Sequence, residues 1–138
     1  MVITKTIKMN TKGETDIIDI TSSVGSLLKK SGAKEGTATV FITGATGGIT
    51  TVEYEPGLVS DLKDVFEKLA PRKGNYAHNE KWGDGNGFSH VRASLLGPSL
   101  TVPFSKGELT LGRWQQIIFI DFDNRPRSRE IVVKIIGE

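Results

Sequence analysis

Alternating apolar and polar side chains run through most of this sequence and predict a chain built mainly from β-strands. Successive side chains of a strand point to opposite faces, so a strand with one covered face shows a two-residue period. Residues 117–120 are apolar at every position, which predicts a central strand covered on both faces. The predicted strands cover residues 2–9, 14–20, 37–43, 49–53, 90–96, 100–104, 114–122 and 130–136.

Two segments depart from this alternation and predict helices. In residues 58–69, apolar side chains recur at spacings of three and four. Pro56 suits the first turn of this helix and Pro71 marks its end. A second helix is predicted after residues 21–23, whose hydroxyl groups can cap it, and Gly32 can close it in a left-handed conformation.

The connections complete a predicted fold of the α+β class. Residues 10–13 are of types that favour a turn, and they are predicted to join the first two strands as a hairpin. Residues 72–88 show no period and contain four glycines, which predicts a loop. Because no linker or repeat is visible, we expect one domain, residues 1–138. Its core is a mostly antiparallel β-sheet or sandwich with two helices.

Composition narrows the classes of function. The 138 residues include no cysteine, which excludes disulfides, thiol nucleophiles and cysteine-bound zinc. A net charge of +2, without a helix-turn-helix or basic helix, argues against a nucleic-acid partner. No apolar run approaches the roughly 20 residues that cross a bilayer, and the first residues lack the pattern of a signal peptide. We therefore expect a cytoplasmic protein with neither a nucleic-acid nor a membrane partner.

Both histidines lie in residues 76–96, the segment richest in candidate chemistry. The strand predicted over 90–96 places His90, Arg92 and Ser94 on one face, with the apolar side chains on the other. This polar face is either solvated or the wall of a pocket. His78 lies upstream, and two imidazoles with one carboxylate are typical of a facial metal site. The candidate carboxylates are Asp84, Glu80 and Glu53. The alternative is that His78 is a surface residue of a loop and His90 a polar residue whose hydrogen bonds are satisfied.

Two further segments could bind an anion. Asp84 to Gly87 reads Asp-Gly-Asn-Gly, which favours either a backbone anion nest or a plain turn. Alternation places Arg127 and Arg129 on one face, where their guanidinium groups could hold a phosphate. The alternative for these arginines is a solvated hairpin tip. Trp114 is interpreted as a core or subunit-interface residue.

Several of these residues carry a resemblance to a known family. The segments His90–Leu100 and Gly107–Ile117, with Val102-Pro103 between them, resemble the pattern of the YjbQ-like family. Tyr76-x-His78 after a helix and Arg127–Arg129 before a β-branched strand fit the same pattern. The resemblance implies a compact α+β fold with a sandwich-like core. It also implies a homotrimer, with sites between or near the subunits.

The resemblance also implies an activity and a site. Members are labelled secondary thiamine-phosphate synthases, which are transferases, and they present three histidines that resemble a metal or anion site. The second and third match His78 and His90, and the implied cofactor is a divalent metal, Zn or Mg. The first histidine corresponds to Gly44, whereas Glu53 at the end of that segment is retained.

Gly44 limits which of the family's site properties can apply to this chain, because two histidines in one chain cannot build a three-imidazole zinc site. Either a carboxylate such as Glu53 replaces the missing ligand, or the metal is lost, or the pocket binds an anion through Thr46 and backbone amides. The implied catalytic residues are His78, His90, Arg92 and Glu53, of which the two histidines are also the metal ligands. The implied ligand-binding residues are Thr46, Asp84, Asn86, Ser94, Arg127 and Arg129.

Three functions follow from these residues. The first is thiamine-phosphate synthase-type transfer between phosphorylated pyrimidine and thiazole precursors, in which cationic groups neutralise the departing oxygens. The second is a binding module that holds a phosphorylated metabolite or anion without turnover. The third is a structural trimer with a degenerate metal pocket.

Overall fold

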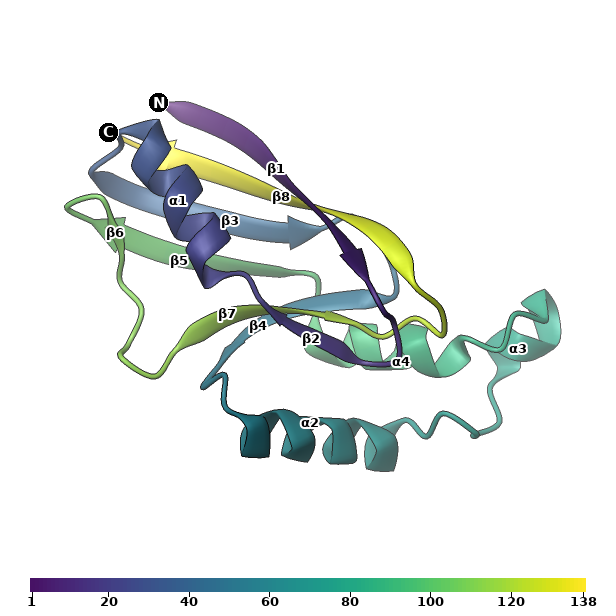
Figure 1. The fold of residues 1–138 in the computed structure, drawn as a ribbon. Helices are drawn as coiled ribbons and strands as arrows, with labels where there is room; N and C mark the ends of the chain where they lie inside the picture. Colours follow the sequence, from purple (N-terminus) through teal and green to yellow (C-terminus); the bar gives the residue numbers. More distant parts are fainter.

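The computed structural model describes residues 1–138, apart from the side chain of Trp82. Its strands form two antiparallel sheets that pack against each other (Figure 1). The larger sheet has the order β1-β8-β3-β5-β6 and the smaller the order β2-β7-β4. The strands are β1 (Val2–Thr11), β2 (Asp16–Asp19), β3 (Glu35–Ile42), β4 (Gly47–Val52), β5 (Ser99–Ser105), β6 (Glu108–Leu109), β7 (Gln116–Asp121) and β8 (Arg127–Gly137).

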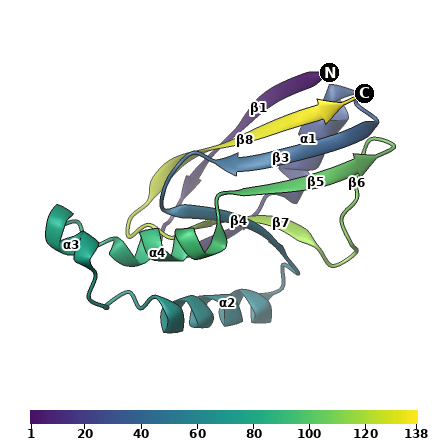
Figure 2. The same ribbon diagram turned by 180° about the vertical axis from the view of Figure 1, so that it is seen from behind.

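Four helices surround these sheets, which confirms the α+β class but doubles the expected number of helices. Helix α1 packs on the inner face of the larger sheet, and α2 and α4 lie along the outer side of the smaller one (Figures 1 and 2). Among the described residues, no helix is both long and apolar enough to cross a membrane. The helices are α1 (Thr21–Ser31), α2 (Pro56–Leu69), α3 (Ala77–Trp82) and α4 (Gly87–Leu96).

Strand β7 is the central covered strand that its unbroken apolar run predicts. Its alternate side chains enter two different cores, which explains why it has no polar face. Ile117 and Phe119 point into the main core, between the two sheets and α1. Ile118 and Ile120 point the other way, into a second core beneath α2 and α4. One strand therefore anchors both hydrophobic clusters.

The hairpin predicted between residues 2–9 and 14–20 is wrong. Strand β1 pairs with β8 over ten residues, whereas β2 pairs with β7 in the other sheet. The connection at Gly13, Glu14 and Thr15 has three consecutive positive φ angles, and the N–H of Glu14 donates to the carbonyl of Asp123. The turn thus sends the chain from one sheet to the other instead of folding it back on itself.

The strand predicted over residues 90–96 is also wrong, because this segment lies in helix α4. Phe88, Arg92 and Ala93 are buried at helical spacing. Val91 and Leu95, which the strand would have placed in the core, are 40% and 59% exposed. His90, Arg92 and Ser94 therefore do not share one face.

Smaller corrections concern element ends. Helix α2 begins at Pro56 and ends before Pro71 as predicted, and Gly32 closes α1 in the left-handed region. Residues 21–23 are not caps: they lie inside α1, and Asp19 accepts the hydrogen bonds of the Thr21 N–H and hydroxyl. Residues 72–88 include the short helix α3. Trp114 precedes β7 and is 62% exposed, so it is not a core residue of this chain.

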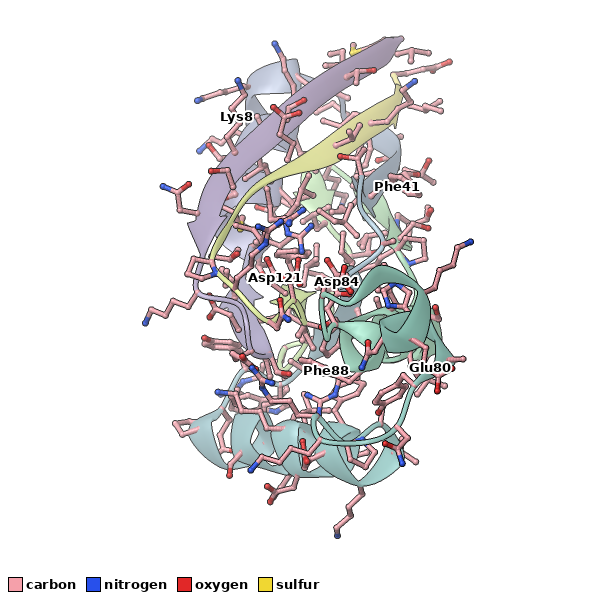
Figure 3. The ribbon with its side chains drawn as sticks, turned by 90° about the vertical axis from the view of Figure 1, so that its right-hand side faces the viewer. Lys8, Phe41, Glu80, Asp84, Phe88 and Asp121 are labelled. Atoms are coloured by element: carbon pink, nitrogen blue, oxygen red, sulfur yellow. The ribbon has the colours of Figure 1, made fainter. Side chains whose placement is uncertain are left out.

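The central role of β7 predicts a large difference between two phenylalanines. Phe119 is fully buried in β7, whereas Phe41 of β3 is 41% exposed and is labelled on the outer side of the larger sheet in Figure 3. Phe119→Ala should lower the free energy of unfolding by about 3–5 kcal/mol, because it leaves a cavity. Phe41→Ala should lower the free energy of unfolding by less than about 1.5 kcal/mol. Urea denaturation of the two variants measures both losses of stability. Equal losses would contradict the placement of Phe119 in the core and of Phe41 outside it.

Candidate functional site

Arg129 of β8 and Asp121 of β7 form a buried ion pair between the two sheets. Their side chains are 5% and 0% exposed. The Nε and Nη2 groups of Arg129 donate to the two carboxylate oxygens of Asp121 at 2.7 and 2.8 Å, which is the paired geometry in which arginine binds carboxylate most strongly. The hydroxyl of Thr11 donates to Oδ2 of the same carboxylate at 2.5 Å. The ends of β1, β7 and β8 are fixed together by this contact.

Both partners stay charged in spite of their burial. Burial by itself raises the pKa of Asp121, but the hydrogen bonds from Arg129, Thr11 and the N–H of Asp123 outweigh it and lower the pKa. The hydrogen bond to Asp121 raises the pKa of Arg129 in the same way, against the effect of burial. The pair is therefore a fixed set of charges and does not titrate near neutral pH.

Asp123 extends this pair into a wider polar network. Its Oδ2 lies 3.4 Å from Nη1 of Arg127 and accepts from the hydroxyl of Thr46 at 3.4 Å. Its Oδ1 accepts from Nδ2 of Asn86 at 3.3 Å. Nη2 of Arg129 donates to Thr46 at 2.7 Å. The structure thus brings together four of the six predicted ligand-binding residues: Thr46, Asn86, Arg127 and Arg129. The alternative prediction, that Arg129 lies at a solvated hairpin tip, is wrong because this side chain is buried.

The connection between β3 and β4 passes directly over Arg129. A Cβ atom placed on Gly44 would lie 3.0 Å from Nη1 of Arg129. Within the described part of the chain, this Nη1 donates no hydrogen bond, in contrast to Nε and Nη2. The backbone N–H groups of Gly44, Ala45 and Thr46 likewise donate none to the described residues. Four N–H donor groups without an acceptor among the described residues therefore lie at this connection, two of them on the buried residues Thr46 and Arg129.

A small pocket lies beside this connection. Its volume is about 220 Å³. The β3–β4 connection forms one wall and α4 forms the other. Apart from His90 and Ser94, the lining residues are small or apolar: Gly44, Ala45, Gly47, Ala93 and Pro98.

The two histidines are in contact, although they come from different helices. The rings of His78 in α3 and His90 in α4 have their centroids 4.4 Å apart and are tilted by 37°. Nδ1 of His78 is buried and lies 3.7 Å from Oδ1 of Asp84. Asp84 is held by Nδ2 of Asn124, which donates to its backbone carbonyl at 2.9 Å. Figure 3 shows Asp84 on the segment between α3 and α4, with Glu80 on the outer side of the helices.

The surroundings of His90 favour its uncharged form. Partial burial and the neighbouring His78 lower the pKa of His90, and the carboxylates of Asp123 and Asp84 oppose this only in part.

The metal that the resemblance implies does not fit the described residues. No three His, Asp or Glu side chains among them are grouped so that they could hold a metal ion. Asp84 is the carboxylate 3.7 Å from His78, and the third histidine position is Gly44, which has no side chain.

Three predicted site residues lie elsewhere or act differently. Arg92 is buried under α2, where it donates to the carbonyl of Ala70, the hydroxyl of Thr15 and the carboxylate of Glu67. Glu53 lies beyond the end of β4, on a separate surface hollow near Trp114. Ser94 does line the pocket, but its hydroxyl donates to the carbonyl of His90.

Two aspartates on which the site is built were not predicted from the sequence. Asp121 and Asp123 are 0% and 2% exposed, although they lie beside the turn whose arginines were given a solvated hairpin tip as their alternative. One signal was available: Asp121 directly follows the four-residue apolar run of β7 and is itself followed by Phe122. A charged residue inside such a run is buried only if it is paired, and the arginines at 125, 127 and 129 were the candidate partners.

Comparisons with known proteins agree with this architecture over the whole chain. A family model described as "UPF0047 protein YjbQ-like" matches residues 5–138. A UPF0047 protein of Methanothermobacter thermautotrophicus is 39% identical over 137 residues, which cover 99% of this chain and 94% of that protein. One of Archaeoglobus fulgidus is 35% identical over 130 residues, covering 94% and 98% respectively.

Solved structures give the same result. The crystal structure of a YbjQ-like protein of unknown function from Sulfolobus solfataricus P2 has a TM-score of 0.95 and 30% identity, and the match covers 100% of this chain and 99% of that one. A YjbQ/UPF0047 family protein from Clostridium acetobutylicum has a TM-score of 0.87 and 36% identity, covering 96% and 99%. Both similarities extend over nearly the full length of each chain, and the two solved structures have the same fold as this protein.

The buried pair predicts how stability depends on pH. The pKa of Asp121 is lower in the folded chain than its ordinary value of 3.8, so its stabilising effect is complete above that value and is lost as the pH falls further. Asp121→Asn should lower the free energy of unfolding at pH 7 by about 3–5 kcal/mol, because it leaves Arg129 buried without its partner. The difference from the unmodified protein should shrink below about pH 4.

Urea denaturation at pH 7 and at pH 3 measures this, with Asp64→Asn on the exposed side of α2 as the matched control. If the variant Asp121→Asn loses the same stability relative to the unmodified protein at both pH values, the carboxylate of Asp121 is not charged in the folded protein.

Proposed function

Because the chain belongs to the UPF0047 family of YjbQ-like proteins, whose function is unknown, we propose for it a function based on its own pocket: it binds the phosphoryl group of a small phosphorylated metabolite. The observation that carries this proposal is the group of unused N–H donors at the β3–β4 connection. Nη1 of Arg129 and the backbone N–H groups of Gly44, Ala45 and Thr46 have no acceptor among the described residues.

These donors suit an anion for two reasons. Backbone N–H groups without an internal acceptor can donate to a bound anion, and a guanidinium group adds a charged donor. The pair with Asp121 holds Arg129 in place, so little side-chain freedom is lost when a ligand binds. Since Asp121 and Asp123 balance the charges of Arg129 and Arg127, recognition depends on directed hydrogen bonds more than on net charge.

The size of the pocket limits the ligand. Its volume of about 220 Å³ is below the roughly 300–1,000 Å³ of pockets that enclose drug-sized molecules. It is large enough for a phosphoryl group with a few attached atoms, and the rest of a larger ligand would lie outside.

The same size argues against the transferase that the resemblance implies. Thiamine-phosphate synthase-type transfer requires a pyrimidine diphosphate and a thiazole phosphate at one site, and the pocket of a single chain is too small for both. Turnover of these two precursors by the purified protein, abolished by His90→Ala, would support that activity in place of binding alone.

Other expectations from the sequence stay predictions. The homotrimer, with sites between or near subunits, is checked by sedimentation equilibrium. Bound zinc or magnesium is checked by elemental analysis of protein purified without added metal. The predicted cytoplasmic location of the protein is a compartment in which it would encounter phosphorylated metabolites.

Gly44 provides a specific test of phosphate binding. Gly44→Ala places a methyl group 3.0 Å from Nη1 of Arg129, where it crowds this donor. Its backbone does not have a positive φ, so the change introduces no conformational strain. We expect inorganic phosphate to bind at least about tenfold more weakly, a loss of roughly 1.4 kcal/mol, measured by isothermal titration calorimetry.

The matched control is Gly25→Ala in α1, where an added Cβ would meet no atom within 4 Å. This variant should bind phosphate as the unmodified protein does. If phosphate does not bind to the unmodified protein, or if Gly44→Ala binds it equally well, the proposed site is incorrect.

A further inference from the structure

We propose that His90 is a phosphoryl acceptor: one of its ring nitrogens takes the phosphoryl group from a small phosphomonoester in the pocket and passes it to water. The proposal rests on the proposed function, because it requires the phosphoryl group to be held beside His90. It goes further, since it makes the chain a phosphatase with a covalent phosphohistidine intermediate.

The choice of nucleophile follows from what lines the pocket. The lining side chains other than His90 and Ser94 carry no nucleophilic atom. The hydroxyl of Ser94 is engaged with the carbonyl of His90 at 2.8 Å, as is common for serine within a helix. The chain has no cysteine. This leaves the imidazole of His90 as the side chain that can attack phosphorus from within the pocket.

The surroundings of His90 provide the charges that such a transfer requires. Gly44 and Ala45, whose backbone N–H groups have no acceptor among the described residues, line the pocket, and Nη1 of Arg129 lies next to Gly44. In this proposal these groups bind the phosphoryl oxygens on which negative charge is spread in the transition state. These donors are fixed by Asp121 and by the ends of the two sheets. Preorganised donors of this kind do not need to reorient as the charge develops.

His78 is placed to carry the proton. Its ring is in contact with that of His90, at a centroid distance of 4.4 Å. Its Nδ1 is buried without a hydrogen-bond partner among the described residues, and Oδ1 of Asp84 lies 3.7 Å away. Asp84 thus supplies the counter-charge when His78 holds a second proton, and Asp123 is the other carboxylate whose charge acts on His90.

The atoms balance over two steps. In the first, a bond forms between a nitrogen of His90 and phosphorus, the ester P–O bond breaks, and the leaving oxygen takes a proton from His78 to become an alcohol. In the second, a water oxygen attacks phosphorus, the P–N bond breaks, and His78 takes back a proton from the water. The net reaction converts a phosphomonoester and water into an alcohol and inorganic phosphate, with no metal and no redox change.

The experiment uses p-nitrophenyl phosphate as the phosphomonoester, with the purified full chain. After brief mixing and quenching at alkaline pH, the intact mass should rise by one phosphoryl group, and acid should remove it. Peptide mapping should place the group on His90. His90→Asn should lack the adduct, whereas His78→Asn should keep it and release it roughly a hundredfold more slowly, because the proton carrier is gone.

Each result bears on the two proposals differently. Phosphate binding without an adduct overturns the phosphoryl transfer and leaves the proposed function standing. No binding and no adduct overturns both. An adduct on another residue, or one that survives His90→Asn while circular dichroism shows that this variant is folded, overturns the role of His90. If His90→Asn does not fold, the mapped adduct and the slow release by His78→Asn decide the question.

Discussion

The ion pair between Asp121 and Arg129 is the interaction on which the rest of this structure depends. It lies where the end of β7 meets the start of β8, so it joins the smaller sheet to the larger one. A buried charge pair of this kind is an uncertain source of net stability, because removing both charges from water offsets their attraction. Its value here is positional: two of the three nitrogens of the guanidinium are bound, and the third is directed to the surface under Gly44.

Gly44 and Arg129 must therefore be considered together. In the family pattern that this chain resembles, position 44 is a histidine, which suggests a metal or anion site of three imidazoles. Here the missing side chain exposes a guanidinium nitrogen instead, beside a pair of histidines that lacks a third ligand among the described residues. In the function that we propose, this one substitution favours an anion held by N–H donors at a position where the family pattern has an imidazole.

Local patterns predicted much of the fold but not its long-range pairings. Strand β7 and helix α2 were evident because an unbroken apolar run of four residues is typical of a covered strand, and a sustained helical period is typical of an amphipathic helix. Helix α4 was misread because Val91, Ala93 and Leu95 imitate the two-residue period of a strand, although only Ala93 is buried. The pairing of β1 with β8 joins opposite ends of the chain, and no local signal at the turn near Gly13 indicated that it would not form a hairpin.

The candidate site was predicted in its parts and not in its arrangement. Thr46, Asn86, Arg127 and Arg129 were singled out by residue type, and the structure joins them in one network through Asp121 and Asp123, which the sequence left in a solvated turn. Arg92 shows the reverse: its charge suggested catalysis, but the helical turn of α4 directs it to Glu67 and Thr15. Which face a side chain takes depends on the period of its element, so a wrong period misplaces every residue on it.

The central claim is that Arg129 and the β3–β4 connection together bind a phosphoryl group. Nuclear magnetic resonance of the nitrogen-15-labelled chain, titrated with inorganic phosphate, tests this most directly because it reports on each N–H group separately. We predict that the largest shifts are those of the backbone N–H groups of Gly44, Ala45 and Thr46 and of the guanidinium of Arg129. Shifts confined to other surfaces, or none at any phosphate concentration, would contradict the account.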